Sequence, residues 1–219
     1  MVKRRKVGNL LALAVLSALA GGIPMHPYQL ANVLKRTGKD PEMKIKWGSL
    51  YTVVQNLERH GFIEATSSDR EGRRPERTTY SITEAGREEM CDWIRELIAD
   101  PERQHPPFET ALSVVGVLGP DETATLLRTR AEALEKSLTA DRAALAEVAL
   151  AVPRLFLIEE EYTLAMREAE ARWVRSLLAE MEAGTMAGIA QWRDYQQSGE
   201  MAAQWARLVA EEGGPTDGD

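Results

Sequence analysis

The residues with the most informative chemistry lie on one side of a predicted helix, within residues 46–63. Apolar residues recur there at helical spacing, and the opposite side presents Thr52, Gln55 and Arg59. Hydroxyl, amide and guanidinium groups supply the donors and acceptors that read base edges in a DNA groove. An ordinary solvated face is the alternative, and this helix alone does not exclude it. Three more polar residues flank the outer side: Ser49, Tyr51 and Asn56.

A basic hairpin follows this helix and favours the DNA interpretation. Gly61 ends the helix, and two strand-like runs, residues 62–67 and 78–83, enclose a turn that allows positive φ at Gly72. Four arginines lie at or near its tip: Arg70, Arg73, Arg74 and Arg77. Charge runs usually form solvated loops, but beside a polar helix face we expect phosphate or minor-groove contacts. A helix followed by such a hairpin is the layout of a winged helix, and Lys44 and Lys46 precede its helix.

The net charge of −7 conceals two halves of opposite sign. Residues 1–80 hold 14 Lys and Arg against 7 Asp and Glu, whereas the remaining residues hold 13 against 27. The basic half can neutralise phosphates, and the acidic half is repelled by them. We therefore expect double-stranded DNA to be contacted by the first half alone.

The sequence contains no constellation typical of catalysis. Its three histidines are scattered, and no phosphate-binding loop, paired cysteines or His-x-x-x-His spacing occurs. His26 precedes Pro27 and is interpreted as a helix-entry residue rather than a metal ligand. We expect no enzyme activity, no metal and no cofactor.

The remaining elements of the first half complete a small helical core. Residues 9–20 and 26–36 read as helices, the first apolar nearly all round. Residues 3–6 (KRRK) followed by that apolar run also resemble a signal peptide, but the run serves equally as the first helix of a three-helix domain. No run approaches the roughly 20 apolar residues that span a bilayer. Cys91 is alone, so we expect a reducing, cytoplasmic setting, associated with the nucleoid through DNA.

The second half reads as helices that pack on other helices. A helix from about residue 84, with Thr83 as its cap, is followed by prolines at 101, 106 and 107, which mark a boundary. A short helix is expected at residues 108–118, a heptad helix from 121 to about 150, and another long helix from Pro153 to near Gly184. An intrachain hairpin is the simplest interpretation, but two apolar faces without a third layer favour an antiparallel homodimerisation arm. The expected interface residues are Leu127, Leu134, Leu138, Leu145, Ile158 and Tyr162. The predicted domains are therefore residues 1–100 and 101–184, followed by a helical tail, 185–219, with a frayed acidic end.

Three segments make the chain resemble the PadR family of bacterial transcriptional regulators. These are HPYQL at 26–30, WGSLYTVVQNLERHGFI at 47–63 and TTYSITEAGREEM at 78–90. Residues 108–184 resemble the carboxy-terminal domain of the longer members. The resemblance implies a mainly helical fold with a β-hairpin wing, dimers formed through the carboxy-terminal helices, operator binding, and Ser49 and Tyr51 close to the DNA backbone. The tail after Gly184 departs from the family's plan.

These observations predict a homodimeric, sequence-specific repressor. Some PadR members release DNA on binding small aromatic or drug-like molecules, and Trp93 and Trp173 are the candidate effector residues here. Buried aromatics usually pack cores, which is the alternative role for both. The competing function is a helical adaptor whose basic half binds nucleic acid or an acidic partner without sequence preference.

Overall fold

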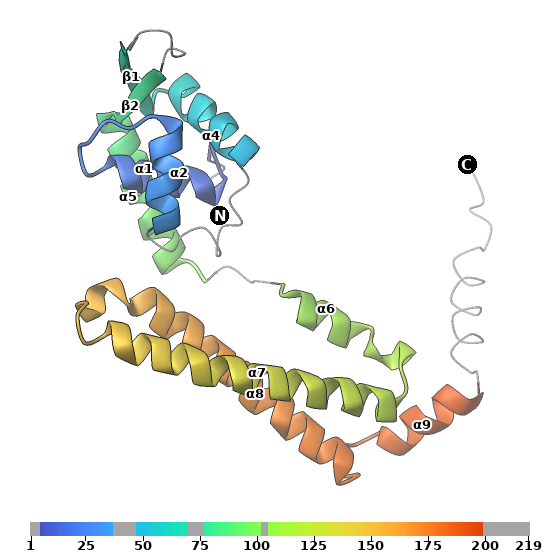
Figure 1. Ribbon diagram of the computed structural model, residues 1–219. Coiled ribbons are helices and arrows are strands. Elements are labelled where there is room, and N and C mark those ends of the chain that lie inside the picture. The colour runs from blue at the N-terminus through green and yellow to red at the C-terminus, as the bar shows by residue number, and fades with distance from the viewer. Residues whose placement is uncertain (1–4, 37–46, 70–76, 102–104, 199–219) are drawn as a thin grey trace, which may run out of the picture. The chain divides into compact units, whose positions relative to one another are not determined.

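The computed structural model describes residues 5–36, 47–69, 77–101 and 105–198 (Figure 1). The chain divides into two compact units, residues 1–104 and 105–219, and the described part of the predicted tail, residues 185–198, lies in the second unit. The predicted fold, mainly helical with a β-hairpin wing, is confirmed. None of the helices in the described ranges is long and apolar enough to cross a bilayer.

The first unit is a winged helix-turn-helix. Its described elements are α1 (Leu10–Leu19), α2 (Pro27–Arg36), α4 (Trp47–Arg59), β1 (Ile63–Asp69), β2 (Arg77–Ile82) and α5 (Glu84–Ala99). The predicted helices and both strands are present, with ends that differ by a residue or two. Both strands extend further towards the wing tip than the sequence indicates.

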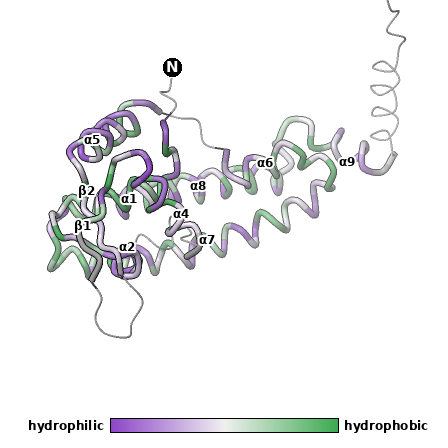
Figure 2. Tube along the Cα trace, turned by 90° about the horizontal axis from the view of Figure 1, so that it is seen from above, coloured by the Kyte–Doolittle hydropathy of each residue, from purple (hydrophilic) through white to green (hydrophobic). Residues whose placement is uncertain are grey.

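Helix α1 is the centre of this unit. It packs against α2, α4, α5 and β2, and its side chains Val15, Leu16 and Leu19 are almost completely buried. The apolar run that resembles a signal peptide is therefore a core helix here, one of the most hydrophobic segments of the chain (Figure 2). From α4, Leu50 and Leu57 enter the same core, which leaves the opposite side of α4 outside it.

The wing is an antiparallel two-stranded sheet. Ile63 pairs with Ile82, and the register shifts between Ala65 and Ser67. Thr83 anchors the base of the wing: its hydroxyl donates to the Gly61 carbonyl at 2.7 Å and accepts the Gly86 N–H at 3.0 Å. The predicted cap at Thr83 is thus present, and it joins α5 to the turn that follows α4.

The second unit is a long helical hairpin with shorter segments at its base. Its described elements are α6 (Pro107–Ser113), the 3₁₀ turns η1 (Val115–Val117) and η2 (Arg154–Phe156), α7 (Pro120–Val148), α8 (Ile158–Glu182) and α9 (Ile189–Ser198). Helices α7 and α8 run side by side, with hydrophobic and hydrophilic residues alternating along both (Figures 1 and 2). Their core contains Leu127, Ala131, Val174 and Met181.

Two helix predictions in this unit are wrong in detail. The single helix expected at residues 108–118 is broken after Ser113, because η1 and an extended Leu118 turn the chain into α7. The helix expected to begin at Pro153 begins instead at Ile158, after the η2 turn. Apolar periodicity does not distinguish a 3₁₀ turn from the first turn of an α-helix.

Candidate nucleic-acid interface

The outer side of α4 is polar and open to solvent. Tyr51, Thr52, Gln55 and Arg59 are exposed, while Ser49 and Asn56 are half-buried. The Arg59 guanidinium donates to Asn56 Oδ1 at 3.1 Å, one turn earlier on the same helix. These six residues expected from the sequence therefore share one helix, with their hydrogen-bonding groups away from the core.

The start of α2 lies beside the wing. Met25 and Tyr80 exchange two backbone hydrogen bonds, at 3.1 and 3.0 Å. His26 caps α2 with Gln29: the His26 N–H donates to Gln29 Oε1, and the Gln29 N–H donates to His26 Nδ1. The interpretation of His26 as a helix-entry residue agrees with this geometry. The pair fixes the α2 N-terminus, whose positive dipole end suits phosphate.

A cavity of about 420 Å³ lies where α2, α4 and β2 meet. Tyr51 and Gln55 line it from α4, and Tyr28 and Tyr80 line it from α2 and the wing. Burial, and then the nearby Glu58 carboxylate, raise the pKa of Tyr80, whose hydroxyl donates to Glu58 Oε2 at 3.5 Å. Three tyrosine side chains and an amide thus face one recess beside the exposed side of α4.

The amino-terminal segment adds polar groups that the sequence pattern did not assign to this surface. Lys6 and Asn9 line a second recess, of about 380 Å³, together with Ser49, Thr52 and Asn56 of α4. The positive charges of the KRRK run at residues 3–6 could have indicated a contact with DNA. In the sequence this run stands out only because it resembles the start of a signal peptide. Lys6, the last residue of this run, adds a positive charge to the polar surface of α4.

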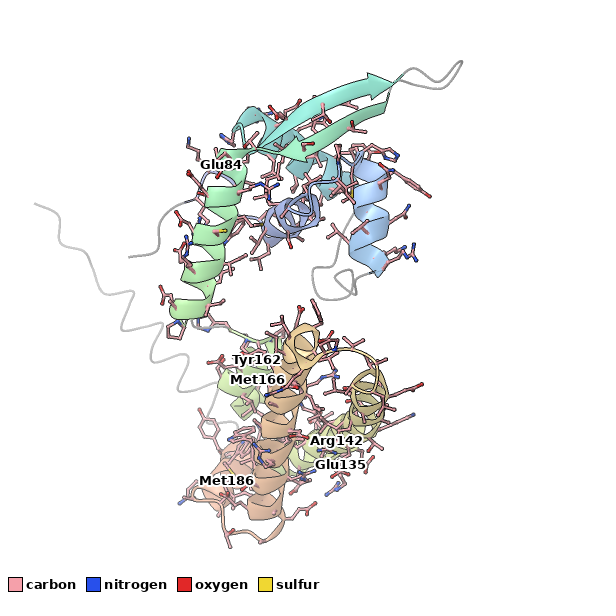
Figure 3. The ribbon with its side chains drawn as sticks, turned by 90° about the vertical axis from the view of Figure 1, so that its left-hand side faces the viewer. Glu84, Glu135, Arg142, Tyr162, Met166 and Met186 are labelled. Atoms are coloured by element: carbon pink, nitrogen blue, oxygen red, sulfur yellow. The ribbon has the colours of Figure 1, made fainter. Side chains whose placement is uncertain are left out.

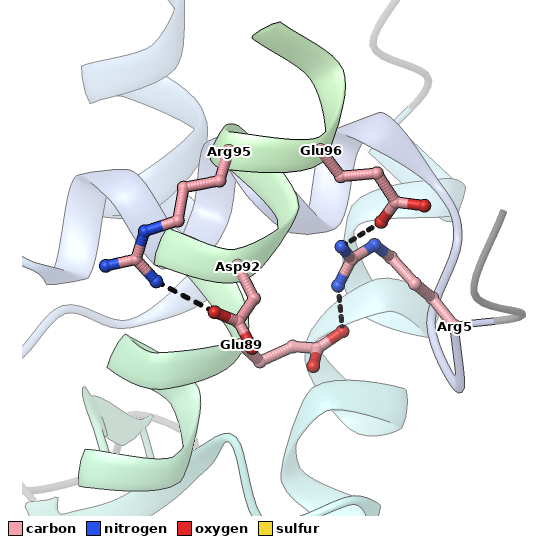
Figure 4. A network of polar contacts seen from close by, with 5 residues as sticks. All are labelled: Arg5, Glu89, Asp92, Arg95 and Glu96. Atoms are coloured by element: carbon pink, nitrogen blue, oxygen red, sulfur yellow. Dashed lines mark hydrogen bonds and ion pairs between the residues drawn. The ribbon is translucent and has the colours of Figure 1, made fainter. Parts of the chain in front are cut away.

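Arg5 anchors this segment to α5 (Figure 4). Its guanidinium pairs with Glu89 at 2.6 Å and with Glu96, and it lies over the Trp93 ring, 5.3 Å from the centroid. Burial lowers the pKa of Arg5, but hydrogen bonds to both glutamates outweigh it and the net pKa is raised. Arg5 thereby holds Lys6 beside α4.

Several predicted DNA-contact residues lie outside the described residues or lack a described side chain. Lys44, Lys46, Arg70, Arg73 and Arg74 belong to the first group, and Arg77, at the start of β2, to the second. Their roles stay predictions. Within the described ranges no cluster of His, Cys, Asp or Glu has the composition to hold a metal ion.

The two candidate effector residues lie in different surroundings. Trp93 is 5% exposed, belongs to the core of the first unit and is covered by Arg5, so it has the packing role that is the alternative to ligand binding. Trp173 is 48% exposed on α8 and meets the Phe108 ring edge-on, with centroids 6.1 Å apart. Of the two, only Trp173 has an accessible face.

The residues expected at the dimer interface also fall into two groups, one buried within the chain and one exposed. Leu127 and Leu138 are buried within the chain, Leu134 packs against the α7–α8 core, and Leu145 is half-buried. Ile158 and Tyr162 are exposed, by 56% and 63%, and Met166 follows one turn later on α8 (Figure 3). The heptad of α7 is therefore used largely for packing within the hairpin, whereas Ile158, Tyr162 and Met166 leave apolar side chains exposed on α8.

Comparison with known proteins finds one family model that matches within the first unit. Residues 15–92 match the model of the transcriptional regulator PadR-like family. Among curated proteins, none matches the chain.

Solved structures give the same fold. PadR of Bacillus subtilis bound to operator DNA aligns with a TM-score of 0.62 and 18% identity, over 78% of this chain and 99% of PadR. The same protein with p-coumaric acid gives a TM-score of 0.63 at 18% identity, over 79% and 99%. The Vibrio cholerae virulence activator AphA gives 0.57 at 19% identity, over 79% of this chain and 98% of AphA.

Proposed function

Because residues 15–92 form a PadR-like domain, and the matched family consists of transcriptional regulators, we propose that this chain is a sequence-specific, homodimeric DNA-binding repressor. Helix α4 reads base edges in the major groove through Thr52 and Gln55, with Ser49, Tyr51, Asn56 and Arg59 around them. The wing arginines, Lys44 and Lys46 contact the phosphate backbone or minor groove. Lys6 joins this set from the amino-terminal segment.

One observation carries the proposal: the hydrogen-bonding side of α4 is exposed while its apolar side is fixed in the core. Leu50 and Leu57 are almost completely buried, and Gln55 points away from them on an exposed surface. A rigid helix that presents amide and hydroxyl groups has the geometry that base-edge recognition requires. The positive balance of residues 1–80 supplies the attraction to phosphate.

A dimer follows from the way such helices bind. Two recognition helices placed about one helical turn apart, roughly 34 Å, read the two halves of a pseudo-palindrome. Ile158, Tyr162 and Met166 form an exposed apolar strip on α8 that a second copy can cover. The acidic second half then lies in the dimer rather than on the DNA.

An effector that releases the operator is part of the proposal. The Bacillus subtilis PadR structure with p-coumaric acid shows that protein with a small aromatic acid. We place an aromatic effector of this chain in the second unit, near Trp173, rather than at the buried Trp93. Such a ligand weakens DNA binding only if it favours the DNA-free geometry.

A footprint on the DNA upstream of the chain's own gene tests the function. We expect a protected, pseudo-palindromic segment that survives excess random DNA, and fewer transcripts from that promoter in vitro when the protein is added. Protection without sequence preference would instead support the adaptor alternative. More transcripts would make the protein an activator.

A further inference from the structure

The second unit contains an apolar cavity of about 510 Å³ between α6, η1 and the first turns of α7. This volume lies within the range of small-molecule sites, about 300–1,000 Å³. Phe108 and Leu112 line it from α6, Val115 from η1, and Leu126 and Leu127 from α7. Only two of the lining residues are polar, Thr123 and Arg130.

Both polar residues have unused hydrogen-bonding capacity. The Thr123 residue is 5% exposed, and its hydroxyl has no partner among the described residues. The Arg130 guanidinium lies 3.7 Å over the Phe108 centroid and donates to Glu170 through Nε and Nη2, whereas its Nη1 has no partner within the described ranges. A buried hydroxyl without a hydrogen-bond partner destabilises the folded chain, and a ligand group that pairs with it removes this penalty. An apolar recess with a few unsatisfied donors is the usual composition of a ligand site.

One wall of this cavity is held in place by the tail helix α9. The Gln196 side-chain amide donates to the carbonyls of Gly116, Val117 and Leu118, at 2.7, 3.0 and 3.1 Å. The Trp192 indole N–H donates to the Leu118 carbonyl at 2.9 Å. Donors of α9 thus contact two carbonyls of η1 and that of Leu118 directly after it, and short 3₁₀ hydrogen bonds alone would fix this turn poorly. Arg193 adds an ion pair with Asp121 at 2.9 Å.

We propose that this cavity binds a small, mainly apolar aromatic molecule that carries one hydrogen-bond-accepting or anionic group, and that α9 shapes the cavity by holding η1. The body of the ligand lies against Phe108, Leu112 and Leu127. Its polar group accepts from Arg130 Nη1. That this ligand also acts as the effector rests on the proposed function, whereas binding itself does not.

A second copy of the chain is the competing occupant. The exposed apolar strip of Ile158, Tyr162 and Met166 lies on the first turns of α8, whereas the cavity adjoins the first turns of α7. Because α7 and α8 are antiparallel, those two sites lie towards opposite ends of the hairpin (Figure 1). The polar groups without partners therefore lie apart from the surface assigned to dimerisation, which favours a small molecule.

The test uses the full chain without DNA and the fluorescent probe 8-anilinonaphthalene-1-sulfonate, an aromatic sulfonate. We expect saturable binding that weakens at least about tenfold in Ala111→Trp, which fills the cavity, and in Arg130→Met, which removes the donor. The matched controls are Ala133→Trp on the exposed side of α7, and Arg128→Met, whose arginine pairs with Glu182 outside the cavity. Both controls should bind the probe within about twofold of the natural chain.

Gln196→Ala tests the role of α9. It should weaken binding of the probe several-fold, while the circular dichroism and the thermal midpoint of the second unit stay close to those of the natural chain.

Equal binding of the probe by the cavity variants and their controls would overturn the proposal. So would a change of sedimentation from dimer to monomer in Ala111→Trp, which would assign the cavity to a second copy. Operator affinity, measured separately, would show whether the proposed function fails while ligand binding holds.

Discussion

At the scale of single residues, the exposed side chains of α4 and the wing arginines should serve different purposes. Gln55→Ala and Thr52→Ala should each reduce discrimination between operator and random DNA, by about 1–3 kcal/mol where a bidentate hydrogen bond to a base is removed. Arg73→Ala and Arg74→Ala should weaken both DNAs alike and flatten the salt dependence, by a log–log slope of about 0.9 for each phosphate that is no longer neutralised. Competition titrations at several salt concentrations measure both effects. Equal loss of specificity from the two sets would reverse the assignment of the surfaces.

The Arg5 anchor allows a stability prediction with a close control. Arg5→Ala removes a guanidinium whose side chain is 6% exposed and which pairs with both Glu89 and Glu96. We expect a loss of about 2 kcal/mol in the free energy of unfolding, less than the roughly 3–5 kcal/mol of fully buried pairs because both glutamates keep some solvent.

Arg95→Ala is the control for this prediction. It removes the exposed pair with Asp92 on the same helix (Figure 4), and should cost less than about 0.5 kcal/mol. Urea unfolding followed by Trp fluorescence compares the two. A smaller loss in Arg5→Ala than in Arg95→Ala would show that Arg5 does not anchor the segment.

At the scale of elements, the approach of α5 to the start of the wing depends on Gly86. A Cβ built at this position would lie 2.0 Å from the Phe62 carbonyl oxygen, a backbone atom that cannot move aside cheaply. Gly→Ala within a helix ordinarily stabilises by about 1 kcal/mol. Here we expect Gly86→Ala to destabilise by about 3 kcal/mol, since α5 must shift away from the wing.

The control for Gly86→Ala is Gly8→Ala, a glycine substitution in the same unit. The Gly8 Cβ would meet nothing within 4 Å, so this change should leave the midpoint of chemical unfolding nearly unchanged. DNA binding should fall further in Gly86→Ala than the loss of folded protein alone explains, because α5 and the α4–β1 turn share the Thr83 hydrogen bonds. A neutral Gly86→Ala would mean that α5 packs less closely than the geometry indicates.

At the scale of the whole molecule, the exposed strip on α8 should decide the oligomeric state. Tyr162→Glu and Met166→Glu place charges where a second copy would bury apolar area, and each should shift sedimentation from dimer to monomer at micromolar concentration. Operator affinity should fall with dimerisation, since one recognition helix then binds alone. Thr163→Glu, about 100° around the same helix from Tyr162 and about 60° from Met166, is the matched control and should remain dimeric. A natural chain that sediments as a monomer would remove the dimer from the proposal.

The sequence determined most of the first unit by local rules. The spacing of Leu50 and Leu57 defined the buried side of α4, and therefore which polar residues had to be outside. Gly61 and Thr83 marked the ends of elements because positive φ and side-chain capping are local properties. Gln55 and Thr52 could be found in this way without any knowledge of tertiary contacts.

Only the tertiary structure decided which apolar surfaces are used within the chain. Periodicity shows that Leu127 and Leu138 are covered, but it does not distinguish a neighbouring helix from a second copy. The position of Lys6 beside α4 depends on Arg5 reaching α5, and Arg5 and Glu89 are 84 positions apart in the sequence. The hydrogen bond from Gln196 to the Gly116 carbonyl joins residues that are 80 positions apart in the sequence. Contacts of this kind have no periodic signature, because they depend on where the chain returns rather than on how it coils.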